Sequence, residues 1–587
     1  MWADGPAVLG HRRLRIIDLT EASDQPFVSK DGKIALIYNG EIYNYRELRA
    51  ELESLGHGFR STGDTEVVMR AYQQWGVDCP SHFNGMFAFA IWDGSRKRLM
   101  LSRDRFGEKP LFYRRVAGAL IFASEIKSIL SVIPASPTPH AGNIRRYLAT
   151  GDLDLDESTF VEGVLAVPAA HSLLWDASGR VQRVPYWQPS LARADHGRTF
   201  SERAATFRAL MEDSVRLRLR SDVPLGSSLS GGIDSSAIVC LVKELSAPGL
   251  QQRTFTARFA NHPQDEGHFV DIVARKTGAE RHDVWVNPEG FLTDLPQLQW
   301  AQEAPFGGAS VYAQWEVMKL AHQHNTTVLL DGQGADELLG GYGTAYGMYW
   351  SHLLYRGNVV RLARELVAYL GIHGIPVTPA LYAAYFTLPR RARAGLVTRY
   401  YRSSKVIAPQ LGRASSNGSV PRMKGLSRFQ RMLMGQLTTS SLPELLRYAD
   451  RNSMAFAREI RLPYLDHRLV EYAMTLPPED LISGSVRKRI LRQSMRGIVP
   501  DVVLQRKDKV GFEPPQTRWL RGPLKPWLNE MLSAAEKRTD IFRAAGVRVA
   551  RKEFEAGGED TVVWRVASVE AWFRHFLEAP GPPADMA

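Results

Sequence analysis

Leu229-Ser-Gly-Gly-Ile-Asp-Ser-Ser236 joins an apolar, strand-like run at 223–229 to a helical pattern at 234–245. This order of strand, short glycine-rich turn and helix is typical of an α/β fold built on a parallel sheet. The small residues allow backbone N–H groups to approach an anion, and the N-terminus of the helix adds the positive end of its dipole. The sequence therefore predicts an anion-binding loop at the carboxyl end of a strand.

The loop carries an aspartate, Asp234, and lacks the Gly-Lys-Ser/Thr ending of a Walker A loop. A carboxylate beside a bound phosphate would repel it unless a metal ion lies between the two. Asp234 therefore favours a Mg2+ ion that bridges this side chain and a phosphate. The alternative is a turn rich in serine and glycine in which Asp234 caps the helix.

A second loop with acidic residues, Asp331-Gly-Gln-Gly-Ala-Asp-Glu337, follows an apolar strand predicted at 327–330. In a parallel sheet both loops lie at the carboxyl ends of strands, where ligands bind. Asp336 is then a second candidate ligand for the metal. The alternative, an acidic surface turn, is weaker once the two loops lie on one sheet edge.

The first part of the chain, to about residue 187, reads as short strands with turns and one helix. We expect a strand at 33–38 that ends in a turn at Asn39-Gly40, because this dipeptide is typical of tight turns. Further strands of the same sheet are expected at 86–92, 98–102 and 120–123. A polar stretch at 188–198 is the expected linker, and the first domain is placed at 1–190.

In the second part, 199–587, predicted helices alternate with isolated strands. Strands are predicted at 253–259 and 283–286 in addition to those before the two loops. Alternation of this kind implies a parallel sheet. Beyond Gly340 the pattern is mostly helical.

Composition limits the class of protein. The chain has 587 residues, of which 44% are hydrophobic and 23% are charged, as in globular proteins with more than one domain. Two cysteines, Cys79 and Cys240, exclude a disulfide scaffold and any cysteine-rich metal module. No apolar run reaches membrane-spanning length, and the first residues lack a signal-peptide pattern.

The positive charge is concentrated in one segment. The formal net charge is +12, and residues 366–443 contain eleven Lys or Arg with no Asp or Glu, which leaves +1 for the rest (12 − 11). A nucleic-acid-binding protein is the rival class for a basic chain, but no RNA- or DNA-reading motif is present. We expect a solvated face or an acidic partner for this segment.

Three charged motifs follow in the C-terminal half. Alternating charges at 450–468 are typical of a solvated helix face, and the basic run at 488–492 is either surface or a phosphate ligand. The third motif, Arg506-Lys-Asp-Lys-Val-Gly-Phe512, is also basic.

Taken together, these motifs resemble the glutamine-hydrolysing asparagine synthetase family. The stretches that carry the resemblance are SLSGGIDSS, LDGQGADELLGGY, RNSMAFAREIRLPYLDHRLVE and KRILRQ, preceded by HRRLRIIDL, YNGEIYNYRELR, GDTEVV, GMFAFAIWD and SRDRFGEKPLFY. The resemblance implies an αββα glutaminase domain of the N-terminal-nucleophile-hydrolase type. It implies a second, parallel-sheet synthetase domain of the adenine-nucleotide α-hydrolase-like (PP-loop) type with a helical C-terminal part.

For the synthetase half, the resemblance implies that ATP adenylates the side chain of aspartate, and that ammonia displaces AMP to give asparagine. Mg2+ and basic groups must offset the charge of the leaving pyrophosphate. Asp234 and Asp336 would hold Mg2+, and Lys488 would neutralise pyrophosphate. The residues that would cradle pyrophosphate are Ser230, Gly231, Gly232, Ser235 and Ser236. Those that would line the ATP site are Leu229, Ala257, Asp331 and Gly332.

For the glutaminase half, the resemblance implies that Arg13 and Asp64 hold the α-carboxylate and α-amine of glutamine. Asn39 and Gly40 would form the oxyanion hole, and Glu41 would help to hold the substrate. An arginine for the carboxylate and an aspartate for the ammonium is the expected charge pairing.

The nucleophile of that half is a departure from the family, whose mature chain begins with a cysteine that uses its own α-amino group as base. Here residue 2 is Trp, and neither Cys79 nor Cys240 has a free α-amino group. Either the reading frame is longer, so that the domain is truncated and lacks its first strand, or the protein uses free ammonia. We favour the longer frame, because the glutamine-holding residues are all retained.

Gln333 is a second departure, since the family commonly has Glu between these two glycines, beside the acyl-adenylate. Glutamine keeps the shape and one acceptor but loses the charge and the option of acting as a base. A rival function is therefore amidation of another carboxylate, on a sugar, a peptide or a lactam precursor. We expect small-molecule partners only, without nucleic acid or membrane, a cytoplasmic location and a homodimer.

Overall fold

The computed structural model describes residues 1–134, 136–176, 178–190, 197–247, 251–389, 392–393, 405–411, 425–507, 513–579 and 581–583. The expected linker at 188–198, the basic segment at 366–443 and the motif at 506–512 lie partly outside these described residues.

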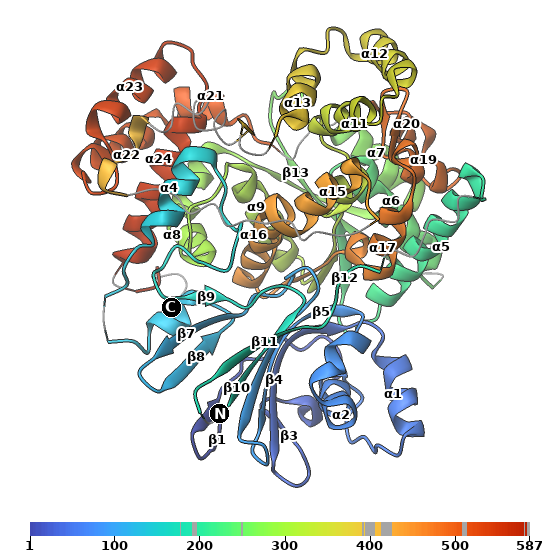
Figure 1. Ribbon diagram of the computed structural model, residues 1–587, viewed down its shortest axis with the longest axis vertical. Coiled ribbons are helices and arrows are strands. Elements are labelled where there is room, and N and C mark those ends of the chain that lie inside the picture. The colour runs from blue at the N-terminus through green and yellow to red at the C-terminus, as the bar shows by residue number, and fades with distance from the viewer. Residues whose placement is uncertain are drawn as a thin grey trace.

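The first part of the chain forms two larger antiparallel sheets that pack face to face (Figure 1), and a short hairpin of β1 (Trp2–Asp4) and β2 (Ala7–Leu9). The larger sheet has the order β11-β10-β6-β5-β4-β3, with bounds Val181–Pro185, His171–Asp176, Arg98–Arg103, Gly85–Asp93, Ile34–Ile42 and Phe27–Val28. The smaller has the order β8-β7-β9, with bounds Ala119–Ala123, Phe112–Val116 and Leu165–Ala166. The run at 120–123 therefore belongs to the smaller sheet, and its assignment to the larger one was wrong.

Strand β5 explains the layering, because its alternate side chains enter two different cores. Phe87, Phe89 and Ile91 pack with the helices α1 (Tyr45–Ser54) and α2 (Asp64–Trp75). Ala88, Ala90 and Trp92 pack toward the smaller sheet, whose outer side contacts α3 (Ile126–Leu130). The order of layers is helix, sheet, sheet, helix, which confirms the αββα expectation.

The second part is built on a parallel sheet with the order β14-β13-β12-β15-β16. The bounds are Glu280–Trp285, Arg253–Arg258, Leu225–Ser228, Val328–Leu330 and Glu459–Arg461. The strand order reverses between β12 and β15, so the crevice at their carboxyl ends is the point where ligands bind in such sheets. Both predicted loops follow these two strands.

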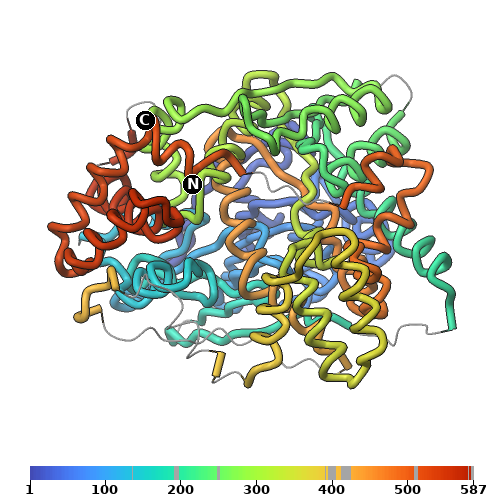
Figure 2. Tube along the Cα trace, turned by 90° about the horizontal axis from the view of Figure 1, so that it is seen from above, coloured from blue at the N-terminus to red at the C-terminus, as the bar shows by residue number. Residues whose placement is uncertain are grey.

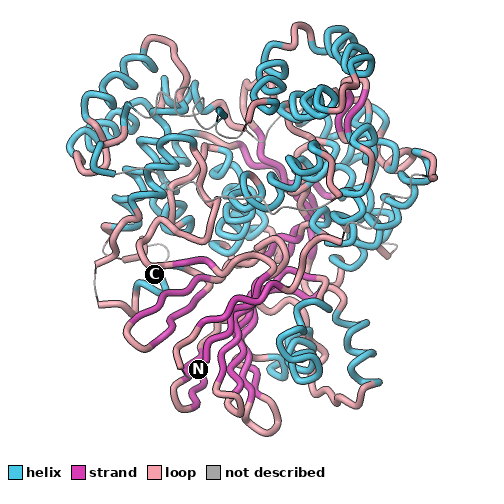
Figure 3. The backbone as a smooth tube through the Cα atoms, in the orientation of Figure 1, coloured by secondary structure: helices cyan, strands magenta, loops and turns pink. Residues whose placement is uncertain are grey.

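Helices cover this sheet as the sequence predicts. The predicted helices at 234–245, 269–276 and 311–324 correspond to α6 (Ile233–Leu245), α7 (Gly267–Thr277) and α9 (Ser310–Gln323). The chain beyond Gly340 is mostly helical, and Figure 3 shows these helices around the strands. Figures 1 and 2 show two separate groups, α11–α13 (Thr344–Tyr355, Val359–His373, Val377–Thr387) and α22–α24 (Lys525–Lys537, Ala544–Glu555, Thr561–Trp572).

The expectation of a solvated, charged helix face at 450–468 was wrong, because part of this segment forms the buried strand β16. Glu459 and Arg461 are 4% and 0% exposed, and Arg461 Nη2 lies 3.4 Å from Glu41 Oε2 of the first domain. Asp450, on α16 (Leu442–Ala455), is also buried and accepts a hydrogen bond of 3.2 Å from Lys109 Nζ. The charges are buried because they pair across the interface between the two domains.

The described residues contain no helix that is both long enough and apolar enough to cross a membrane.

Candidate active sites

The loop after β12 has the geometry of an anion cradle. Gly231 has a φ of +79°, and a Cβ on it would lie 3.0 Å from Phe269 Cβ and 3.1 Å from Glu266 O on the neighbouring segment. Only glycine satisfies both conditions without strain. The N-cap of α6 is Gly232 and no side chain caps this helix, so the alternative in which Asp234 is a helix cap is wrong.

Serine hydroxyls support this loop from within. Ser230 N donates to Ser235 Oγ at 3.2 Å, and the two hydroxyl oxygens lie 3.1 Å apart. Ser236 Oγ is buried and has no hydrogen-bond partner among the described residues. Buried polar atoms normally find partners, so this hydroxyl is a free group for a ligand in the loop.

The loop after β15 packs against the first loop. A Cβ on Gly332 would lie 3.1 Å from Ser235 N and 3.1 Å from Asp234 Cβ, so the two loops are in contact. Asp331 Oδ1 accepts a 3.2 Å hydrogen bond from Gln333 N, and desolvation raises the pKa of Asp331. Gln333 Oε1 is buried without a hydrogen-bond partner among the described residues.

Lys488 joins the two loops. Its Nζ lies 2.5 Å from Asp234 Oδ2 and 2.5 Å from Asp336 Oδ1, and the residue is 3% exposed. A hairpin of β17 (Ile482–Ser483) and β18 (Val486–Arg487) places it here, with a left-handed φ of +53° that is uncommon outside glycine. The alternative in which this basic run is surface is therefore wrong for Lys488.

A small cavity of about 50 Å³ lies beside this ion pair. Its lining consists of residues of the first loop, two residues from other segments and four basic residues: Ser230, Gly232, Ile233, Asp234, Glu266, Gly341, Arg487, Lys488, Arg492 and Arg506. Arg506 Nη1 donates to Gly231 O at 3.0 Å, and Arg487 Nη1 donates to Gly341 O at 2.7 Å. These arginines are not among the predicted site residues; the basic runs at 488–492 and 506–512 are the sequence signal for Arg492 and Arg506.

The two aspartates fit a magnesium ion held jointly with phosphate. Asp234 Oδ1 is buried and without a hydrogen-bond partner among the described residues. No cluster of three or more His, Cys, Asp or Glu suited to a metal occurs in the part of the chain that the structure describes. Mg2+ is usually bound through one or two carboxylates, water and substrate phosphates, so a pair is sufficient.

The remaining predicted residues of this site lie on adjacent strands. Leu229 and Ala257 are buried at the ends of β12 and β13. Leu229 N donates to Phe255 O at 3.0 Å, and Thr256 Oγ1 donates to Leu229 O at 2.7 Å. The structure therefore places the segments predicted for ATP, pyrophosphate and metal at the carboxyl ends of the neighbouring strands β13, β12 and β15.

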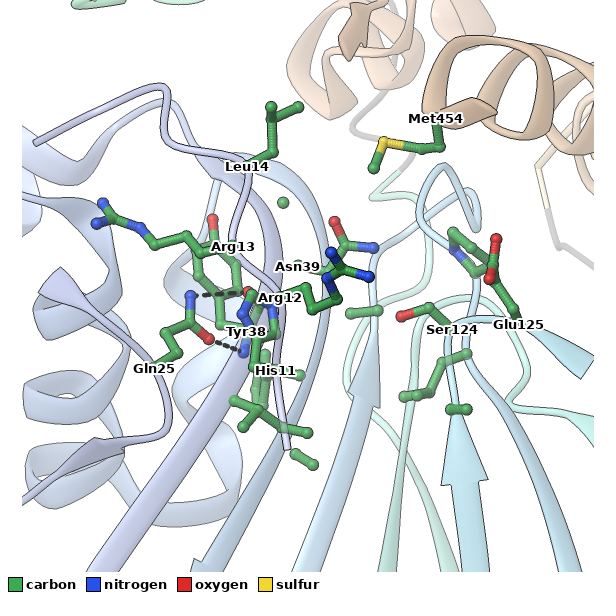
Figure 4. A pocket seen from close by; sticks show the side chains of 18 of the residues that line it. His11, Arg12, Arg13, Leu14, Gln25, Tyr38, Asn39, Ser124, Glu125 and Met454 are labelled. Atoms are coloured by element: carbon green, nitrogen blue, oxygen red, sulfur yellow. Dashed lines mark hydrogen bonds between the residues drawn. The ribbon is translucent and has the colours of Figure 1, made fainter. Parts of the chain in front are cut away.

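A larger cavity, of about 530 Å³, lies in the first domain and is closed on one side by Asp450, Arg451 and Met454 of α16. Figure 4 shows its lining, in which Arg12 extends toward Asn39 and Arg13 extends away from it. The guanidinium of Arg13 donates to the backbone carbonyls of Ile17, Asp18 and Thr20, at 2.8, 2.7 and 3.2 Å.

Asp64 and Glu41 are buried carboxylates of this cavity. Asp64 Oδ2 accepts from Tyr38 Oη at 2.8 Å and from Ile42 N at 3.0 Å, and burial raises its pKa to about 6. Burial also raises the pKa of Glu41 well above its ordinary value, against the opposing charge of Arg461. Two buried acids in a polar cavity are typical of a binding site.

Asn39 and Gly40 lie inside strand β4, so the expected turn at this dipeptide was wrong. Gly40 has a φ of +144°, and a Cβ on it would lie 2.1 Å from Met86 O of β5. The close approach of the two backbones requires glycine there. Asparagine beside glycine reflects this contact rather than a turn.

Neither cysteine is a nucleophile in this fold. Cys79 and Cys240 are 0% and 2% exposed. Burial raises the pKa of Cys79 well above its ordinary value and that of Cys240 to about 12. Both are thiols rather than thiolates at neutral pH.

Comparison with known proteins identifies a family model for each of the two parts of the chain. Residues 206–574 match the family model described as asparagine synthase, which covers more than half of the chain, and residues 1–187 match that of a glutamine amidotransferase domain. An N-terminal-nucleophile-type amidotransferase domain and a PP-loop synthetase domain together define an amidotransferase-type ligase. The chain belongs to the asparagine synthase family.

The relatives are similar over most of their length. Asparagine synthetase [glutamine-hydrolyzing] 3 of Bacillus subtilis is 30% identical over 86% of this chain and 80% of its own. Asparagine synthetase [glutamine-hydrolyzing] 1 of the same organism is 31% identical over 91% and 83%. A protein named amidase chry2, of Gibberella zeae, is 29% identical over 90% and 84%.

Proposed function

We propose that this protein is an ATP-dependent asparagine synthetase. It would transfer AMP from ATP to the β-carboxylate of aspartate, release pyrophosphate, and form asparagine when ammonia attacks the acyl-adenylate and AMP leaves. The observation that carries the proposal is the contact of Lys488 with both Asp234 and Asp336, at the meeting point of the two loops. The carboxylate must first be adenylated, because a free carboxylate is a poor acyl donor.

The proposed roles follow from charge and position. The cradle formed by Ser230, Gly232 and Ser235 would accept the β- and γ-phosphates at the N-terminus of α6. Lys488 would move from its carboxylates to the leaving pyrophosphate as negative charge develops there. A Mg2+ ion on Asp234 and Asp336 would neutralise phosphate charge and polarise the reacting phosphoryl group.

The proposed nitrogen donor is glutamine, with ammonia as the form that reaches the adenylate. In the cavity of the first domain, Asp64 suits the α-amine and Asn39 and Gly40 suit an oxyanion. The two cysteines of this sequence are buried and cannot supply the thiolate. The synthetase reaction is therefore tested with an ammonium salt, which supplies ammonia without glutamine hydrolysis.

The test is pyrophosphate release by the 587-residue chain with ATP, Mg2+ and an ammonium salt. Release that depends on aspartate, with one asparagine formed per pyrophosphate, supports the proposal. No release with any carboxylic acid would overturn it. Asp234→Asn is the control that should abolish release if the reaction occurs at this site.

A second candidate is amidation of a different carboxylate. Gln333 is uncharged, and its Oε1 is buried without a hydrogen-bond partner among the described residues. The loop at 331–337 therefore carries no charge at this position. A relative of similar length is named an amidase, which shows that the family extends beyond asparagine formation. Release that requires a sugar, peptide or other acid in place of aspartate would select this candidate.

A further inference from the structure

We propose that a second anion site lies beside the Lys488 cleft and receives the pyrophosphate that leaves it. This inference rests on the proposed function for the identity of its ligand. The site is an open cavity of about 550 Å³, distinct from the cradle formed by the two loops. Among the described residues its lining is Phe200, Val486, Arg489, Arg492, Gln493, Arg496, Asp501, Leu504 and Gln505.

Arg492 connects the two cavities, because it lines both. Its Nε donates to Arg487 O at 2.8 Å and its Nη1 donates to Leu504 O at 2.5 Å. These hydrogen bonds hold the side chain in place beside both cavities. Asp234, on the cleft side, opposes the lowering of the pKa of Arg492 that burial causes. The guanidinium is therefore within electrostatic reach of both spaces.

The outer cavity carries excess positive charge. Three arginines line it, against one carboxylate, Asp501, which forms no ion pair with any described residue. Arg496 is exposed and makes no side-chain hydrogen bond or ion pair within the described part of the chain. Arg489 donates to Glu479 O at 2.5 Å and lies over the ring of Phe200 at 4.9 Å, which fixes its orientation.

This arrangement suits a compact polyanion. Guanidinium groups bind phosphate oxygens with paired donors, and the Gln493 and Gln505 amides add uncharged donors. The inner cleft has a volume of about 50 Å³, whereas the outer cavity has about 550 Å³ and is open. A pyrophosphate that passes Arg492 would stay in a positive field until it reaches solvent.

The test is calorimetric titration of the full chain with pyrophosphate in a Mg2+ buffer, and separately with inorganic phosphate. We expect two pyrophosphate sites per chain. Arg489→Gln together with Arg496→Gln should weaken the outer site at least about tenfold and leave the inner site unchanged. Lys488→Met should do the reverse. Arg356→Gln, a loss of one exposed positive charge just after the end of α11, is the control and should change neither.

A single site in the parent chain, or a double variant that binds like the parent, would overturn the inference. Equal affinity for phosphate and pyrophosphate at the outer site would overturn the assignment to the leaving group. Failure of the proposed function is seen separately, because acid-dependent pyrophosphate formation is measured without reference to this cavity. In steady-state turnover, the double variant should also show altered inhibition by added pyrophosphate with unchanged KM for ATP.

Discussion

Gly341 lies so close to Asp336 that a Cβ on the glycine would come within 1.7 Å of Asp336 Oδ1. The same Cβ would lie 2.2 Å from Lys488 Cε. Both side chains are held in place by their ion pair, 2.5 Å from nitrogen to oxygen. The positions of Asp336 and Lys488 therefore require a glycine at residue 341, even though its φ lies outside the left-handed region.

Gly341→Ala should lower the rate of acid-dependent pyrophosphate release at least about a hundredfold, because the methyl group displaces Asp336 and Lys488 from the positions that the reaction uses. The melting temperature should fall only modestly. Gly343→Ala is the matched control, since a Cβ there meets nothing within 4 Å. A Gly341→Ala enzyme with parental turnover would show that Asp336 is not needed where the structure places it.

The two loops could be predicted because each strand, turn and helix is encoded locally. Asp234 and Asp336 are separated by about a hundred residues, but the parallel-sheet rule places both at one edge. The contact between them runs through Lys488, whose position depends on a hairpin of two-residue strands. Such short strands leave no periodic pattern in a sequence.

Strand β16 could not be predicted from its own residues. Glu459-Ile460-Arg461 has the charge pattern of a solvated face, but the strand pairs with β15, and Arg461 is paired with Glu459, with two backbone carbonyls of the 218–220 segment and with Glu41 of the other domain. The prediction of a turn at Asn39-Gly40 was wrong for the same kind of reason. Its glycine is required by the backbone of β5 at Met86, a contact between strands distant in sequence.

Lys488→Met should make the enzyme inactive and also change its response to Mg2+. Without the ammonium, Asp234 and Asp336 lose the positive charge that lies between them, and their mutual repulsion should cost about 3 kcal/mol of stability in the absence of metal. A divalent ion can then take the place of the ammonium. We expect Mg2+ to raise the melting temperature of this variant more than that of the parent.

The control for this effect is the double variant Lys488→Met with Asp336→Asn, in which one carboxylate is left. Its Mg2+-dependent shift should be close to that of the parent. An equal shift in the single and double variants would argue against Asp336 as a metal ligand.

Asp64→Asn should stabilise the protein at high pH. Burial raises the pKa of Asp64 from 3.8 to about 6, so the folded protein retains a proton that the unfolded chain has lost between these values. Ionised Asp64 therefore destabilises the fold above pH 6, and the penalty disappears as the pH falls toward 4. Both hydrogen bonds to this side chain end on Oδ2, so the oxygen of asparagine can accept them.

The expected gain is about 2 kcal/mol at pH 8, declining toward zero near pH 4, as measured by denaturant titration at several pH values. Tyr38→Phe is a useful companion, since it removes one donor to Asp64 without changing its charge. A variant Asp64→Asn that is less stable than the parent at pH 8 would contradict the assigned burial cost.

Cysteine reagents should leave the folded protein unmodified. Both thiols are buried and their pKa values are raised, so Ellman's reagent should detect no thiol before unfolding and two thiols after it. The variant Cys79→Ser with Cys240→Ala should keep its ammonia-dependent activity. Loss of that activity with an intact fold would mean that one of these thiols takes part in the chemistry.

Gln333→Glu should add a titration to the pH dependence of the synthetase reaction. In the parent, the buried Oε1 of Gln333 cannot gain or lose a proton in the working range. A glutamate in the same position lies beside Asp331, and burial together with that negative neighbour should raise its pKa above the ordinary value of about 4.3. If this carboxylate assists the attack of ammonia, it must be ionised. The kcat of the variant, measured at constant free ammonia, should then rise through its pKa, whereas the kcat of the parent should not.

Gln333→Met tests whether the side chain of residue 333 acts through its volume or through its amide oxygen, because methionine fills a similar volume without an acceptor. If Gln333 only maintains packing, Gln333→Met should keep the parental pH profile and most of the rate. If its amide oxygen contacts the acyl-adenylate, Gln333→Met should lower kcat about tenfold or more while the KM for ATP stays unchanged, since the lost interaction forms only after adenylation. A Gln333→Glu profile that is flat over the range in which the variant is stable would exclude a proton-accepting role for this position. Ammonia would then attack the acyl-adenylate without a base at residue 333.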